Sequence, residues 1–267
     1  MKNLSVIMIG DVSGDSGLET LERRLPPLIK KHSAVFTVVN GENSAGGFGM
    51  TKATLDRIIN AGADVVTSGN HVWEKREFWP FLEDELKILR PANYPPDTVG
   101  RGWGKYKKEI DGKIFSFLAI NLQGREFLSP IDCPFRTFDS IEKEKDDIIL
   151  VDFHAESGRE KEALGFYLNG RAAVIAGTHT HVQTADEKIL SEGSAYISDL
   201  GMTGVKGAVI GMDPKICIDR VRKQVLYRME TPARSENEKR ALQGIAVAID
   251  TETGKAISVM RIDEDDL

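Results

Sequence analysis

Three apolar runs in the first 70 residues constrain the fold most strongly, because each one ends in a short polar segment that contains glycine. The runs cover residues 4–9, 34–39 and 63–68, and stretches with apolar residues at helical spacing lie between them. Strand and helix alternating at this spacing predict parallel βαβ units. Ligands bind outside the carboxyl ends of the strands in open α/β sheets. The sequence therefore predicts an α/β fold with a polar site at one sheet edge.

The rest of the chain extends this pattern. Residues 114–120, 148–153, 172–176 and 194–198 are further predicted strands. Residues 225–229 and 244–262 are predicted to form antiparallel strands, with a hairpin turn at 250–255, and the acidic residues 263–266 a solvated tail. We find no repeat and no domain boundary, so we expect residues 1–267 to form a single domain.

Composition and charge exclude several classes of protein. The net charge of −6 argues against broad coating of nucleic acid and against binding to anionic membranes, although a small phosphate ligand held by metal ions is compatible with it. No apolar stretch approaches the roughly 18 residues of a membrane span, and we expect the short apolar run at residues 4–9 to be a strand and not part of a secretory signal. Cys133 and Cys217 form no CxxC motif. We expect a cytoplasmic protein without disulfides.

Eight polar side chains follow the predicted strands, and they include four of the five histidines in the chain. They are Asp11, Glu42, Asn43, Asn70, His71, His154, His179 and His181. Carboxylate, amide and imidazole ligands together suit borderline divalent metals such as Mn, Fe, Zn or Co. In extended backbone His179 and His181 would point to the same side. Eight groups are too many for one ion with open positions, so we expect two ions that share a carboxylate.

Two ions about 3.5–4 Å apart form a clamp suited to hydrolysis of phosphate esters. An imidazole that binds neither ion could give a proton to the leaving group, and His71, beside Asn70, is the natural candidate. Taken singly, each residue has a simpler interpretation: a histidine as a structural hydrogen-bond donor, Asp11 as a helix cap, Asn70 as a turn residue. Their combination favours the metal site.

The motifs that carry these residues resemble the calcineurin-like metallophosphoesterase superfamily, and more closely its YmdB-like branch of bacterial phosphodiesterases. The superfamily motifs are Gly10-Asp11, Gly41-Glu42-Asn43, Gly69-Asn70-His71, a lone His154 and Gly177-Thr178-His179-Thr180-His181. The closer resemblance lies in Asn40-Gly41-Glu42-Asn43, Gly69-Asn70-His71-Val72-Trp73, Arg90-Pro91-Ala92-Asn93, Asn121-Leu122-Gln123-Gly124-Arg125, Asp132-Cys133-Pro134-Phe135-Arg136 and Thr178-His179-Thr180-His181-Val182-Gln183-Thr184. The wider superfamily usually has Asp-x-His after the first strand and a bridging Asp, whereas this chain has Ser13 and Glu42, as the branch does.

The resemblance implies a sandwich of mixed β-sheets flanked by helices, with the site at the carboxyl ends of the strands. It implies that Asp11, Glu42, Asn43 and His181 bind one ion. Glu42 would bridge to a second ion held by Asn70, His154 and His179. His71 would be the proton donor.

The resemblance further implies iron or manganese, with zinc, cobalt or magnesium as other options, and hydrolysis of phosphodiesters, with 2′,3′-cyclic nucleotides favoured. It also suggests a homo-oligomer. Two alternatives stay open: a regulatory protein that binds metals and nucleotide with negligible turnover, and a phosphomonoesterase. We expect a small phosphodiester or cyclic nucleotide as substrate, no stable nucleic-acid binding and no membrane partner.

Overall fold

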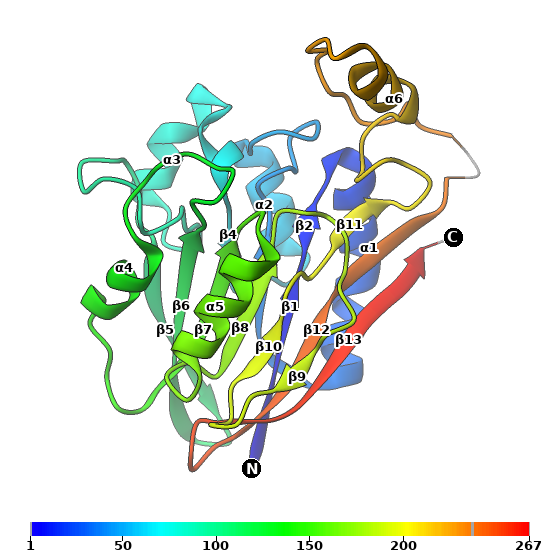
Figure 1. The fold of residues 1–267 in the computed structure, drawn as a ribbon. Helices are drawn as coiled ribbons and strands as arrows, with labels where there is room; N and C mark the ends of the chain where they lie inside the picture. The colour runs from blue at the N-terminus through cyan, green and yellow to red at the C-terminus, as the bar shows by residue number, and fades with distance from the viewer. Residues whose placement is uncertain (1, 236–237, 267) are drawn as a thin grey trace.

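The computed structural model describes residues 2–235 and 238–266 and contains two β-sheets packed face to face, with helices on both outer sides (Figure 1). The first sheet comprises β1 (Asn3–Ile9), β2 (Asp11–Val12), β3 (Ala34–Asn40), β4 (Val65–Thr67), β11 (Met202–Val205), β12 (Arg240–Asp250) and β13 (Ala256–Asp266). The second sheet comprises β5 (Trp103–Ile110), β6 (Lys113–Gln123), β7 (Asp147–His154), β8 (Val174–Thr178), β9 (Lys188–Ile189) and β10 (Ala195–Ile197).

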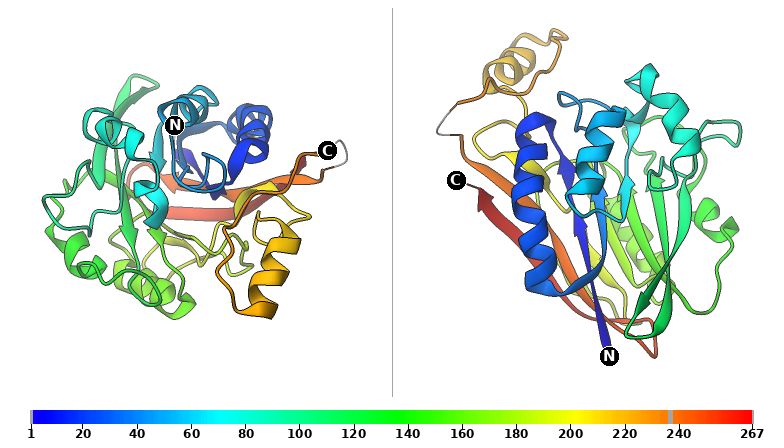
Figure 2. Two further views of the ribbon diagram at one scale, coloured as in Figure 1. Left: turned by 90° about the horizontal axis from the view of Figure 1, so that it is seen from above. Right: turned by 180° about the vertical axis from the view of Figure 1, so that it is seen from behind.

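The helices are α1 (Gly14–His32), α2 (Lys52–Asn60), α3 (Trp79–Asp84), α4 (Pro134–Ser140), α5 (Gly158–Leu168) and α6 (Pro214–Lys223), with short 3₁₀ turns η1 (Asn70–Trp73) and η2 (Arg76–Phe78). Helices α1 and α2 cover the outer face of the first sheet, and α4 and α5 cover that of the second (Figures 1 and 2). The predicted sandwich of mixed sheets flanked by helices is confirmed. Among residues 2–235 and 238–266, no helix combines the length and the hydrophobicity that a membrane-spanning segment requires.

Alternation along the strands builds the layers. In β1, Val6 and Met8 face the second sheet, whereas Ile7 and Ile9 face α1, as the period of two in a strand requires. Between the sheets the ring of Phe36 stacks on that of Phe117, with centroids 4.5 Å apart. Full burial of side chains of this size contributes about 1.5–3 kcal/mol each to stability. The two sheets thus share one hydrophobic core. That residues 1–267 form a single domain stays a prediction.

Strand order places the site. The first sheet runs β2-β11-β12-β1-β3-β4 with β13 beside β12, and the second runs β5-β6-β7-β8-β10-β9. Within them β1, β3 and β4 are parallel, and so are β6, β7, β8 and β10. The carboxyl ends of both parallel sets lie at the upper end of the molecule in Figure 1. The polar segments that follow these strands therefore gather at one end of the sandwich.

Two local predictions were wrong. Residues 225–229 form no strand and follow α6. Val225 and Leu226 are apolar but 51% and 85% exposed, because no strand among the described residues pairs with this segment. Residues 263–266 are not a solvated tail, because β13 continues to Asp266. The Asp266 side chain is 2% exposed and pairs with Arg23 and Arg24 of α1, which neutralise its charge.

Candidate metal centre

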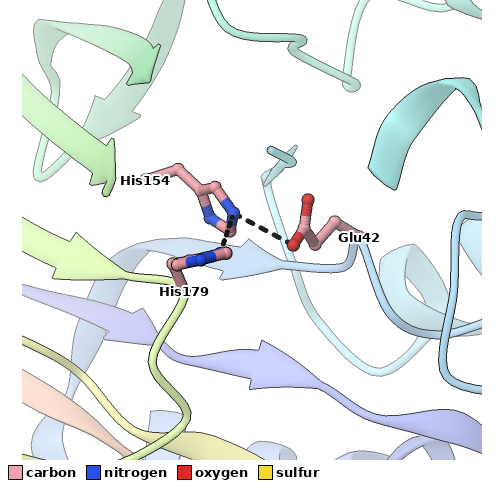
Figure 3. A group of neighbouring side chains, drawn as sticks. All are labelled: Glu42, His154 and His179. Carbon is pink, nitrogen blue, oxygen red and sulfur yellow. Dashed lines mark hydrogen bonds and ion pairs between the residues drawn. The ribbon is translucent and has the colours of Figure 1, made fainter. Parts of the chain in front are cut away.

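Four predicted ligands converge on one point where the two sheets meet. Figure 3 shows Glu42 after β3, His154 at the end of β7 and His179 after β8. The Nε2 atom of His154 lies 3.0 Å from Oε1 of Glu42, 3.0 Å from Nδ1 of His179 and 3.0 Å from Oδ1 of Asn70. Candidate ligand atoms of Glu42, His154 and His179 all lie within 4.8 Å of one another. These are the residues predicted for the second ion.

The spacing of these atoms fits a bound cation. Ligand nitrogens bonded to zinc at about 2.0–2.1 Å in tetrahedral or octahedral geometry lie roughly 2.8–3.4 Å apart. The two imidazole nitrogens of His154 and His179 face each other at that separation. Without an ion only one of them can donate, whereas around an ion both lone pairs, the Glu42 carboxylate and the Asn70 carbonyl all act as ligands. The donor set therefore suits a borderline divalent metal.

The residues predicted for the first ion lie beside this group and include buried acceptors without partners. Asp11 is fully buried, and its Oδ1 lies 3.7 Å from Nε2 of His181 and 4.0 Å from Nδ1 of His154. Among the described residues, neither Asp11 Oδ1 nor Asn43 Oδ1 accepts a hydrogen bond. A buried polar atom costs free energy unless it is paired, so these two oxygens, of which the Asp11 oxygen lies near His181 and His154, fit the ligands of a cation.

Gly69 leaves the space that the second ion group needs. A Cβ at this position would lie 2.2 Å from Cδ2 and 2.3 Å from Nε2 of His154, and 2.4 Å from Oε2 of Glu42. No side chain larger than hydrogen fits between the end of β4 and these two groups. The glycine that precedes Asn70 is therefore required by close approach to the site.

The histidine-bearing loop after β8 has an unusual backbone. His179 and His181 have φ of 102° and 63°, so the expected extended backbone at this segment was wrong. Such conformations cost about 1–3 kcal/mol each and persist only where the surroundings hold them. Here the His179 amide donates to Oδ2 of Asp11 at 3.2 Å, and Nδ1 of His181 contacts the Ile210 carbonyl at 2.8 Å. The strained turn still directs both imidazoles toward the site.

A buried ion pair supports the same loop from below. Lys161 of α5 and Asp199, 2% and 1% exposed, meet with Nζ 2.6 Å from Oδ2. The same carboxylate accepts the amide of Thr180, between the two histidines, at 3.1 Å and that of Gly201 at 2.8 Å. Sequence reasoning missed Lys161, because a lysine in an amphipathic helix is usually exposed.

Electrostatics in the metal-free protein reflect this crowding. Burial opposes ionisation of Glu42, but the neighbouring His154 imidazolium lowers the pKa of Glu42 to about 2. Burial likewise disfavours a charged His154, but the Glu42 carboxylate raises its pKa to about 9. Burial, with the charge on His154, lowers the pKa of His179 to about 3. Burial raises the pKa of Asp11 to about 6, although His181 and His154 act against the shift. A cation would replace the His154 proton as the partner of these carboxylates.

A hydrogen-bonded network behind the ligands was not predicted. The hydroxyl of Thr178 donates to Oδ1 of buried Asp152 at 2.7 Å and lies 3.0 Å from Nδ1 of His154. Since its proton goes to Asp152, Thr178 accepts from Nδ1–H of His154, which leaves the Nε2 lone pair for the site. Asn40 donates to Asp152 at 3.0 Å and accepts the Glu42 amide at 3.1 Å. The one signal in the sequence was the spacing of Asp152 and His154, two apart in a strand and so on one face.

His71 lies at the rim of the centre rather than within it. Its side chain is 25% exposed, and its Nδ1 lies 3.4 Å from Oε1 of Glu74. Its amide donates to Oε2 of Glu42 at 3.1 Å, so the backbone of η1 is fixed to the predicted bridging carboxylate. The ring of Phe48 meets it edge to face, with centroids 4.9 Å apart. All eight predicted site residues thus lie at one end of the sandwich; their roles as ligands and acid remain to be tested.

Comparison with known proteins identifies the family. The model of a family described as YmdB-like protein matches residues 7–262. The chain belongs to the YmdB-like family. This confirms the resemblance seen in the sequence motifs.

Three relatives of this YmdB-like chain span nearly its full length. A 2′,3′-cyclic-nucleotide 2′-phosphodiesterase of Bacillus subtilis is 42% identical over 97% of this chain and 96% of its own. A crystal structure of a hypothetical protein from Thermus thermophilus is 33% identical, with a TM-score of 0.88, over 99% of this chain and 100% of that one. A novel phosphatase from Mycoplasma pneumoniae is 30% identical, also with a TM-score of 0.88, over 100% of this chain and 95% of that one.

Proposed function

We propose that this YmdB-like protein is a metal-dependent phosphodiesterase that opens 2′,3′-cyclic phosphates of nucleotides. The observation that carries the proposal is the convergence of Glu42, His154, His179 and Asn70 on one point, beside the unpartnered oxygens of Asp11 and Asn43. The name of the Bacillus subtilis relative supports the choice of a phosphoric diester as substrate.

We assign Asp11, Glu42, Asn43 and His181 to one divalent ion, and Glu42, Asn70, His154 and His179 to the other. Two ions held there would lower the pKa of a water molecule and neutralise charge on the phosphoryl group. The chain itself sets the geometry, because the Thr178 hydroxyl fixes the tautomer of His154 and Gly69 gives the cluster room. Manganese or iron suits the mixed nitrogen and oxygen donors.

The reaction adds water across one P–O bond. Oxygen from water bonds to phosphorus, the bond from phosphorus to O2′ breaks, and O2′ takes up a proton, which leaves a 3′-phosphate. His71 is proposed to donate that proton. Its partly exposed position at the rim, with its amide bonded to Glu42 of the metal centre, would allow the imidazole to reach a leaving group.

Two further expectations stay proposals. A reducing cytoplasmic location is supported by the two cysteines, Cys133 and Cys217, which are both free. A homo-oligomer is supported by the resemblance to the branch.

The test is hydrolysis by purified protein of 2′,3′-cyclic AMP, bis-p-nitrophenyl phosphate and the monoester p-nitrophenyl phosphate, with Mn²⁺ and with chelator. We expect metal-dependent turnover of both diesters, with 3′-AMP as the product of the first. Loss of a general acid in His71→Ala should lower kcat about 10²–10⁴-fold. The matched control is His32→Ala at the end of α1, which should leave kcat unchanged. Metal-loaded protein that cleaves only the monoester, or binds nucleotide without turnover, would overturn the proposal in favour of a phosphatase or a regulatory protein.

A further inference from the structure

A wide cleft opens beside the candidate metal centre, between the loop after β3 and a lobe that covers residues 206–231 and includes α6. Its volume is about 1110 Å³, which is slightly above the roughly 300–1,000 Å³ typical of small-molecule sites. Phe48, His71 and Lys75 line one wall, and Arg220, Tyr227 and Arg228 line the other. Figure 1 shows α6 standing clear of both sheets, above β11.

The cleft is continuous with the metal centre at two points. His71, which lines it, donates its amide to Glu42. Ile210, which also lines it, contacts Nδ1 of His181 through its carbonyl oxygen. A substrate whose phosphate lies at the metals and whose leaving oxygen faces His71 would therefore extend into this cleft.

The lobe is basic although the chain is acidic. Residues 206–231 contain six lysines and arginines and three aspartates and glutamates, whereas the whole chain carries −6. Within residues 2–235 and 238–266, neither Lys75 nor Arg228 has an ion pair or a side-chain hydrogen bond, so both cations are available to an anion in the cleft. Two carboxylates also line the cleft: Glu74, which lies 3.4 Å from His71, and Glu230. The lining thus carries the three cations of Lys75, Arg220 and Arg228 against these two anions.

Two aromatic rings accompany these cations. Phe48 is partly buried against the His71 ring, and Tyr227 is partly buried beneath the ammonium of Lys223, 5.6 Å from its ring centroid. Arg220 donates to the Tyr227 carbonyl at 3.2 Å, which fixes the backbone of that wall. Aromatic platforms combined with a positively charged groove are how proteins bind single-stranded nucleic acid without strong sequence preference.

We propose that the cleft binds the penultimate nucleotide of a single-stranded RNA whose 3′-terminal nucleotide carries the cyclic phosphate. The preferred substrate is then an RNA terminus rather than a free cyclic mononucleotide. This rests on the proposed function, since the reaction is the same opening of the cyclic phosphate by water, with the O2′–phosphorus bond broken and a 3′-phosphate left. The 5′-phosphate of the terminal nucleotide pairs with Arg228, and bases stack on the rings. In this proposal the protein contacts only the 3′ end of an RNA. This agrees with the expectation from the net charge that the protein does not coat nucleic acid broadly.

The test compares kcat/KM of the Mn²⁺-loaded enzyme for adenosine 2′,3′-cyclic phosphate and for a dinucleotide that ends in the same group. Stacking of a base on an aromatic side chain is worth roughly 5- to 150-fold in affinity, so we expect the dinucleotide to be favoured about tenfold or more at low salt. The preference should fall as KCl rises, because it includes a phosphate contact.

Arg228→Ala should remove most of the preference. Arg222→Ala, which makes the same charge change on an exposed part of α6 outside the cleft, should leave it intact. Equal kcat/KM for both substrates in the wild type, or equal effects of the two variants, would overturn the inference while the proposed function stands. If neither substrate is hydrolysed, the proposed function fails, and fluorescence anisotropy of a labelled trinucleotide with a 3′-phosphate then tests RNA binding by the cleft. Weaker binding by Arg228→Ala but not by Arg222→Ala would support RNA binding in the cleft. No difference between the two variants would refute it.

Discussion

Removal of the buried lysine beneath the histidine loop should destabilise the protein strongly. Lys161 and Asp199 are almost completely inaccessible, with Nζ and Oδ2 2.6 Å apart. In Lys161→Met the aspartate keeps its two backbone amide donors but loses the cation, so a buried carboxylate remains uncompensated. Breaking such a pair costs about 3–5 kcal/mol. With about 2–4 °C per kcal/mol for a chain of this size, the midpoint of thermal unfolding should fall by roughly 6–20 °C.

The assay is urea unfolding of metal-free protein, with thermal unfolding as a second reading. The matched control is Lys31→Met, which removes an exposed lysine that lies 2.7 Å from Glu264, with side chains 61% and 37% exposed. An exposed pair contributes about 0–1 kcal/mol, so this variant should unfold close to the wild type. The reasoning would be refuted if Lys161→Met lost less than about 1 kcal/mol, since the Asp199 carboxylate would then need no buried cation.

The remaining predictions concern the metal centre. Gly69→Ala should abolish metal uptake, measured by elemental analysis, because its Cβ would lie 2.3 Å from Nε2 of His154, whereas Gly158→Ala, with no atom within 4 Å, should retain it. Thr178→Val should weaken Mn²⁺ binding about 10–100-fold in calorimetry, since the outer partner of His154 is lost; Thr203→Val, which removes a buried hydroxyl without a partner among the described residues, should not. Because the pKa of His154 is raised to about 9 in metal-free protein, its proton must leave when metal binds. The Mn²⁺ association constant should therefore rise up to about tenfold from pH 7 to pH 8 and level off above pH 9, and an equal constant at pH 7 and 8 would contradict the assignment.

The raised pKa also has a consequence for stability without metal. A histidine whose pKa is raised above its ordinary 6.5 stabilises the folded state fully below pH 6.5 and loses that contribution as pH rises through about 9. Glu42, whose pKa is lowered to about 2, contributes stability above pH 4.5 and loses it as pH falls through about 2. Both contributions are complete only between about pH 4.5 and 6.5.

The strands and the polar residues that follow them could be predicted from the sequence, because apolar runs indicate strands and apolar residues at helical spacing indicate the helices between them. A short, β-branched apolar run such as residues 148–153 is typical of a strand buried on both faces, and a histidine at the end of such a strand, such as His154, lies at the sheet edge. The backbone of the His179 loop could not be predicted, since positive φ at a histidine depends on tertiary contacts that hold it.

Features set by distant partners were also beyond the sequence. Asp266 lies in an acidic run that suggests solvent, yet Arg23 and Arg24 neutralise it from the other end of the chain. The lobe that carries α6 was missed, although Asp213 followed by Pro214 is a helix start signal and the Asp213 side chain accepts the amide of Ile216. The lobe that forms one wall of the cleft beside the metal centre is therefore visible only in the folded chain.

The most direct test of the two-ion centre is metal stoichiometry. Protein reconstituted with Mn²⁺ and freed of excess should contain about two ions per chain by elemental analysis. His181→Ala, which removes a ligand predicted for one ion only, should retain about one. Wild-type protein that binds no ion, or a His181→Ala variant that still binds two, would contradict the centre built from these strand ends.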